Sequence, residues 1–155
     1  MALDDDIALL ARQPLLGLME RDALRLVAFA AESRILRAGD ILFRIGEPSD
    51  GGVLVISGTI ALTSREDGQP AEEVAGAGAL IGEMALFTSV ARQATAIARE
   101  PTQVMRLSRS VMRRVLAESP ASAQAVATAI SDRLRGFVDE LTAVQHALTA
   151  IDAVR

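Results

Sequence analysis

The stretch that decides the fold reads GEMALF at residues 82–87, and RQAT follows it at residues 92–95. This loop-sized segment combines a glycine, a carboxylate, the start of a short helix and a guanidinium. Backbone N–H groups at a helix start bind phosphate oxygens, and an arginine neutralises the same phosphate with a planar fork of donors. A carboxylate accepts hydrogen bonds from ribose hydroxyls. The segment is therefore suited to a small sugar phosphate.

Composition limits the classes of protein to which the chain can belong. Its 155 residues suffice for one domain with a hydrophobic core and are too few for two ordinary ones, so we expect a single domain over residues 1–155. Cysteine is absent, which excludes disulfides, iron–sulfur clusters and cysteine nucleophiles. The only histidine is His146, which argues against a histidine-rich metal centre. We expect no catalytic residues, metal or cofactor.

Charge and hydropathy point to the cytoplasm. The net charge of −4 argues against DNA binding by this chain alone, because a DNA-binding surface needs a basic face. Residues 4–6 are all aspartate, whereas a signal peptide begins with basic residues. No apolar run is long enough to span a bilayer, so we expect no membrane contact.

The spacing of apolar residues divides the chain into three parts. Residues 1–31 have a helical pattern: a short helix through Ala11, an interruption at Pro14 and a second helix at about 21–31. Residues 109–155 are helical again. Ser108 or Ser110 is expected to cap a short helix, and a long final helix is expected to begin at Pro120.

Between the helical parts, residues 33–108 consist of short apolar runs separated by turn residues such as Asp67-Gly68. The runs predict strands at 34–37, 41–44, 53–56, 59–63, 72–75, 94–98 and 103–107. Many short strands at close spacing favour a sandwich or jelly roll, and hence an α+β protein. The strands at 53–56 and 59–63 are expected to form a tight hairpin through Ser57-Gly58.

The long C-terminal helix carries an apolar stripe whose members alternate at intervals of three and four residues, the a/d pattern of a coiled coil. They are Leu134, Phe137, Leu141, Val144, Leu148 and Ile151. One interpretation is a helix lying on its own β domain. The stripe extends beyond what a small β domain can cover, so we favour the seam of a parallel helix–helix dimer. His146 lies off this stripe and is expected in solvent.

The order of these elements, and the spacing from Gly82-Glu83 to Arg92, resemble the cyclic nucleotide-binding domain family. That family includes the catabolite activator protein and the regulatory subunits of cyclic-AMP-dependent protein kinase. The segments LRAGD (36–40), IGEPSD (45–50) and VISGTI (55–60) resemble its opening strand, next loop and hairpin. The resemblance covers roughly residues 9–141. It implies an antiparallel β-roll, or jelly roll, flanked by N-terminal helices and a long C-terminal helix, with residues 82–95 as the phosphate-binding cassette.

The resemblance also implies a role for each cassette residue. Gly82 lets the backbone approach the ligand closely. Glu83 would accept a hydrogen bond from the ribose 2′-hydroxyl. The N–H groups of Met84 and Ala85 would point at the cyclic phosphate, and Arg92 would pair with its exocyclic oxygens.

The chain departs from the family pattern at three places, one of which is the cassette loop at residues 88–91, which lacks the proline often found before the arginine. Gln93 stands where the family usually has Ala, Ser or Thr, so its longer amide would contact or crowd the phosphate. Phe137 and Val138 occupy the positions of base-contacting hydroxyl residues, which implies apolar or stacking contact with the base. Leu86 and Phe87 are expected to anchor the cassette helix in the core.

The leading hypothesis is a dimeric regulatory protein, not an enzyme, that binds cAMP or cGMP. Its ligand would reposition the C-terminal helices and so change the surface seen by an unknown protein partner. One alternative is an interaction module with a degenerate pocket, in which Glu83 and Arg92 form a mutual or nearby salt bridge. Another is the sensor fragment of a transcription regulator, because no helix-turn-helix follows the long helix. A further alternative is a metal-dependent cupin. Such an enzyme would need several histidine and carboxylate ligands, and the chain has only one histidine.

Overall fold

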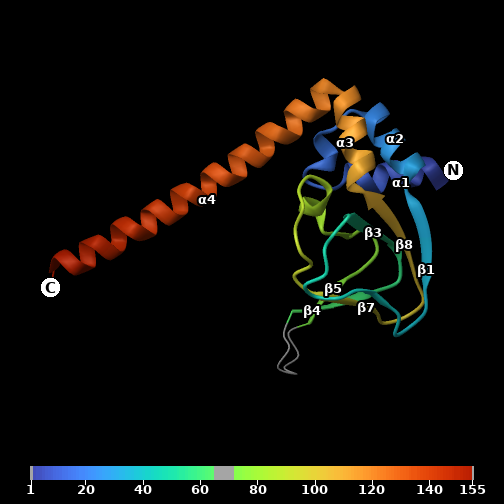
Figure 1. Ribbon diagram of the computed structural model, residues 1–155, viewed down its shortest axis with the longest axis horizontal. Helices are drawn as coiled ribbons and strands as arrows, with labels where there is room; N and C mark the ends of the chain where they lie inside the picture. Colours follow the sequence, from blue (N-terminus) through green and yellow to red (C-terminus); the bar gives the residue numbers. More distant parts are fainter. Residues whose placement is uncertain (1, 65–71, 155) are drawn as a thin grey trace.

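The computed structural model describes residues 2–64 and 72–154; the expected turn at Asp67-Gly68 lies outside them. Helices stand at both ends of the chain, and the strands lie between them (Figure 1). The N-terminal part contains α1 (Ala2–Ala11), the 3-10 turn η1 (Leu16–Leu18) and α2 (Arg21–Ala30). The C-terminal part contains α3 (Arg109–Glu118) and α4 (Pro120–Val154). The predicted helices are confirmed to within a few residues.

The strands form two four-stranded antiparallel sheets in the described part of the chain, which confirms the α+β fold and the β-roll. One sheet has the order β1-β8-β3-β6 and the other β2-β7-β4-β5. In chain order the strands are β1 (Glu32–Leu36), β2 (Ile41–Phe43), β3 (Gly51–Ser57), β4 (Ile60–Thr63), β5 (Glu72–Ala75), β6 (Leu80–Ile81), β7 (Thr95–Ala98) and β8 (Thr102–Ser108). The two-residue β6 has no counterpart among the predicted strands.

The expected hairpin through Ser57-Gly58 is wrong. Strand β3 pairs with β6 and β8, whereas β4 pairs with β5 and β7, so the chain passes from one sheet to the other at this turn. Gly58 has φ +93°, and a Cβ there would lie 2.7 Å from the Pro101 carbonyl oxygen. The Thr59 N–H donates to Thr102 Oγ1 at 3.1 Å, which holds the crossing against the start of β8.

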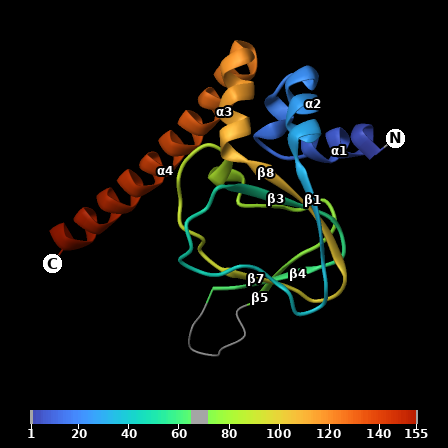
Figure 2. The same cartoon turned by 45° about the vertical axis from the view of Figure 1, so that its right-hand side comes forward.

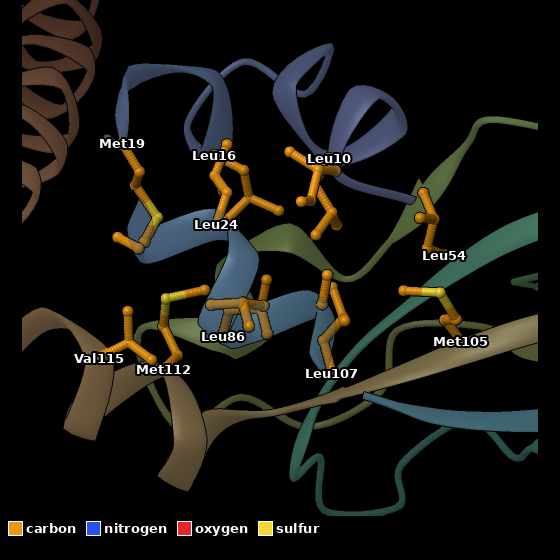
Figure 3. Close-up of a cluster of buried hydrophobic side chains, with 14 of the residues drawn as sticks. Leu10, Leu16, Met19, Leu24, Leu54, Leu86, Met105, Leu107, Met112 and Val115 are labelled. Atoms are coloured by element: carbon orange, nitrogen blue, oxygen red, sulfur yellow. The ribbon is translucent and has the colours of Figure 1, made fainter. Parts of the chain in front are cut away.

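Among the described residues, two hydrophobic clusters hold the fold together. One fills the roll, and the other joins the helices to the outer side of β3 and β8. The cassette takes part in the second cluster through η2 (Glu83–Leu86), since Leu86 is fully buried among side chains such as Leu24, Leu107 and Met112 (Figure 3). Phe87 packs against the same cluster. The predicted anchoring of the cassette helix is confirmed, and burying one leucine side chain contributes roughly 1.5–3 kcal/mol.

Helix α4 leaves the body after its first three turns. Ser122 and Val126 are buried and Ile130 packs against the helical cluster, but every side chain described from Ser131 onward is exposed. Both views show the rest of the helix projecting away from the roll (Figures 1 and 2). The six residues of the predicted apolar stripe are 53–63% exposed. The interpretation in which this stripe covers its own roll is therefore wrong. No described helix has the length and apolarity to cross a membrane.

Candidate functional site

The cassette begins at Gly82, which lies between β6 (Leu80–Ile81) and η2 (Glu83–Leu86) as the N-terminal cap of η2. Gly82 adopts a left-handed conformation (φ 76°, ψ 45°), and its carbonyl accepts a hydrogen bond from the Ala85 N–H at 3.0 Å. A Cβ at Gly82 would lie 2.8 Å from Arg92 Nη1. Glycine is therefore needed here both for the backbone conformation and for the close approach of the guanidinium.

Arg92 is a nearly buried cation, with its side chain only 8% exposed. Its guanidinium lies over the Phe43 ring, 4.2 Å from the centroid, and Nη2 donates to the Gly51 carbonyl at 2.9 Å. The Asp50 carboxylate is 4.0 Å from Nη2 and is itself 80% exposed. Burial lowers the pKa of Arg92, and Asp50 only opposes that shift. A buried cation whose carboxylate partner is solvated and at the outer limit of ion-pair distance is well suited to receive an anionic ligand.

A cavity of about 320 Å³ opens between the cassette and the roll, a volume within the usual range for small-molecule sites. Five of the predicted ligand-binding residues line it: Gly82, Met84, Ala85, Arg92 and Gln93. The other lining residues are apolar: Phe43, Leu62, Ile81, Val90, Ala91 and Ala94. The structure thus brings together a guanidinium, the start of a short helix and an apolar wall. This arrangement suits an anionic group attached to a flat or apolar body.

The carboxylate of Glu83 contacts protein groups outside the cavity. Its Oε2 accepts a hydrogen bond from the Leu15 N–H at 3.2 Å, and its Oε1 lies 3.7 Å from Nη2 of Arg133 on α4. The side chain is 15% exposed and is not among the residues lining the cavity. Glu83 therefore joins the cassette to the N-terminal helices and to α4. Its contact with a ribose hydroxyl stays a prediction.

The degenerate-pocket alternative expects Glu83 and Arg92 to pair either with each other or with other nearby residues. Among the described residues, Glu83 pairs with Arg133, and Arg92 pairs with Asp50.

The predicted base contacts lie far along α4. Phe137 and Val138 are 58% and 50% exposed and do not line the cavity, because α4 has already left the roll at this point (Figure 1). The structure of the single chain therefore does not bring them to the cassette. Their contact with the base stays a prediction, as does the dimer seam formed by the stripe.

Sequence reasoning missed Arg109 and Ser49. Arg109 is the first residue of α3, and its guanidinium donates to the carbonyls of Ala85 and Ser49, both at 2.7 Å. A cation at a helix N-terminus is electrostatically unfavourable, since the first turn carries partial positive charge. An arginine directly after the capping Ser108 is thus a signal that the side chain has a partner elsewhere in the fold.

Comparison with known proteins places this geometry in a family. The cyclic nucleotide-binding domain matches residues 33–119. A cyclic nucleotide-binding-like protein from Brucella abortus is 41% identical; the alignment covers 74% of this chain and 99% of that one, with a TM-score of 0.68. The N-terminal domain of a transcriptional regulator from Streptomyces coelicolor is 29% identical over 86% of this chain and 94% of that one (TM-score 0.77). The sensor domain of the regulator DNR from Pseudomonas aeruginosa is 26% identical over 90% and 95% (TM-score 0.71).

Curated relatives match only in part. A lysophospholipase from Neurospora crassa is 28% identical over 74% of this chain and 8% of its own length. A cyclic nucleotide-gated potassium channel from Mesorhizobium japonicum is 29% identical over 75% of this chain and 31% of its own length. The chain thus spans less than a third of either relative. The family match covers more than half of this chain, and it coincides with the roll and cassette described above. The chain belongs to the cyclic nucleotide-binding domain family.

Proposed function

We propose that this protein is a regulatory protein of the cytoplasm that binds cAMP or cGMP in the cavity beside the cassette. The observation that carries the proposal is the buried guanidinium of Arg92, whose carboxylate partner Asp50 is 4.0 Å away and largely solvated. A cyclic phosphate would supply a negative charge closer to Arg92 than the solvated Asp50, and the N–H groups of Met84 and Ala85 would supply further donors. The apolar wall around Phe43 and Leu62 suits the rest of a nucleotide.

Helix repositioning is the second part of the proposal. Glu83 lies in the cassette and contacts Arg133, beyond which α4 has only exposed side chains. A ligand that drew Glu83 toward the cavity would change the free energy of this contact and so shift the position of α4. A ligand shifts such an equilibrium only by its differential affinity for the two arrangements. The output would be an altered surface for a partner protein, with α4 pairing in a homodimer through the exposed stripe.

The comparisons support a regulatory rather than a catalytic role. The matched segment is a small part of an enzyme in one relative and of a channel in another, so it accompanies different outputs. We propose that this chain has no catalytic activity and needs no cofactor. With a net charge of −4 we expect no DNA binding by this chain alone.

A second candidate is an interaction module whose pocket no longer binds nucleotide. The observation in its favour is that both carboxylate oxygens of Glu83 already face protein partners, Leu15 and Arg133. In that case the Arg92→Ala variant should function in cells like the wild type.

Thermal unfolding tests the proposal directly. A ligand at one hundred times its Kd stabilises the folded state by about 2.7 kcal/mol. For a domain of this size we expect the Tm to rise by roughly 5–11 °C with cAMP or cGMP. The Arg92→Ala variant should show no rise. An unchanged Tm of the wild-type protein at millimolar cAMP and cGMP would favour the interaction module.

A further inference from the structure

The side chain of Arg109 makes three hydrogen bonds that join separate parts of the candidate site. Its Nε donates to the Ala85 carbonyl at 2.7 Å, at the end of the cassette helix. Its Nη2 donates to the Ser49 carbonyl at 2.7 Å and contacts Ser49 Oγ at 2.9 Å. The backbone N–H of Arg109 also donates to the Asp50 carbonyl at 2.8 Å. One residue therefore spans the cassette helix and the loop before β3.

That loop in turn holds the segment that carries Arg92. Ser49 is 6% exposed; its hydroxyl and its N–H both donate to the Val90 carbonyl. The Arg92 N–H donates to the Glu47 carbonyl at 2.8 Å, and the Gly46 N–H donates to the Arg92 carbonyl at 2.7 Å. The relative position of the cassette helix and of Arg92, the two parts that would bind a phosphate, thus depends on the bridge from Arg109 to Ser49.

The position of Arg109 indicates that its guanidinium interacts with other elements and not with its own helix. It is the first residue of α3, where the helix dipole disfavours a cation. In the described part of the chain its side chain forms no ion pair, and its partners are carbonyl and hydroxyl oxygens of other elements. The planar guanidinium presents donors in a fixed geometry, and here it bonds two backbone carbonyls of different segments at once.

We propose that Arg109 is the positioning residue of the ligand site: it holds the cassette helix and the Arg92 loop at the spacing that a cyclic phosphate requires. This inference rests on the proposed function, since the spacing matters only if an anion binds between the two parts.

The test compares three variants in titrations with cAMP and cGMP. Arg109→Ala should weaken binding about ten- to hundred-fold, as expected when charge-assisted hydrogen bonds that hold a site are lost. Arg109→Lys keeps the charge but not the fork, and should remain at least about tenfold weaker than wild type. Arg113→Ala removes an exposed arginine of the same helix and should bind like wild type. Methylguanidinium at low millimolar concentration should partly restore binding to Arg109→Ala.

Hydrogen exchange provides a second measurement that does not depend on the ligand. In Arg109→Ala and Arg109→Lys, amides of residues 83–92 should exchange faster while those of β3 and β8 stay protected. Wild-type affinity in Arg109→Ala, or full recovery in Arg109→Lys, would overturn the proposal. Unfolding of the whole roll in both variants, with equally fast exchange throughout, would also overturn it and make Arg109 a general structural residue. If the wild-type protein binds neither nucleotide, the proposed function fails. Arg109 then remains a positioning residue for these segments only if its two variants show faster hydrogen exchange that is restricted to residues 83–92.

Discussion

Gly82 is the residue whose conformation most directly controls the cassette. Replacing it with alanine imposes a left-handed conformation on a residue with a Cβ, which costs roughly 1–2 kcal/mol, and places that Cβ 2.8 Å from Arg92 Nη1. We expect Gly82→Ala to lower the free energy of unfolding by at least this amount, measured by urea denaturation, and to abolish nucleotide binding. Gly39→Ala is the matched control, since φ is +89° there and nothing lies within 4 Å. If the two variants bind nucleotide equally well, Arg92 does not depend on Gly82.

Arg92 should contribute to binding without contributing to stability. Burial lowers its pKa, which means that the cation is less favourable in the folded chain than in the unfolded chain. This cost applies at every pH below the lowered pKa, and so at all ordinary pH values. Arg92→Met removes the cost together with the Gly51 hydrogen bond and the Phe43 contact, so we expect the free energy of unfolding to change by less than about 1 kcal/mol.

Denaturation of Arg92→Met beside Arg106→Met, which removes a more exposed neighbour (40%), tests this expectation. A loss above about 3 kcal/mol in Arg92→Met alone would identify Arg92 as a structural cation.

The sequence allowed several site residues to be predicted, but not all of their contacts. Gly82 and Arg92 were predictable because a left-handed glycine and a guanidinium at a fixed spacing are local requirements. The partners of Glu83 were not, since Leu15 is 68 positions away in the chain and Arg133 belongs to α4. Arg109 was overlooked because its contacts with Ser49 and Ala85 exist only after the roll has formed.

The ends of the helices and most of the strands could be predicted from capping residues and turn residues in the sequence. Ser108 is one such capping residue, because its side chain accepts hydrogen bonds from the first turn of α3. Strand pairing did not follow. The turn at Ser57-Gly58 has the composition of a hairpin, yet it connects two sheets, and only long-range packing against Pro101 and Thr102 makes that choice. Two-residue β6 is too short to give a periodic signal.

The exposed stripe of α4 predicts association of the whole chain. Leu141→Glu places a charge in the middle of the stripe and should convert a dimer to a monomer at micromolar concentration, measured by sedimentation equilibrium. His146→Glu adds the same side chain off the stripe and should leave the dimer intact. A wild-type protein that is monomeric at high micromolar concentration would contradict the dimer seam.

At the scale of the whole molecule, the cassette is joined to helices at both ends of the chain. Glu83 contacts Leu15 and Arg133, and Arg109 begins α3. Ligand binding should therefore change the exposure of α4, seen as a different rate of limited proteolysis within residues 120–154. Arg133→Ala should reduce the ligand-dependent difference, whereas Arg135→Ala, an exposed neighbour that pairs with Asp132 on its own helix, should not. Identical proteolysis with and without bound nucleotide would contradict the repositioning.

We propose that the cavity beside Arg92 binds a cyclic nucleotide. Calorimetric titration of the purified protein with cAMP and with cGMP, beside the Arg92→Ala variant, tests it most directly. We predict micromolar binding of at least one nucleotide and no binding by the Arg92→Ala variant. The nucleotide that binds more tightly will show which base is selected by a site that has Gln93 beside the phosphate. No heat of binding from either nucleotide with a folded wild-type protein would contradict the claim.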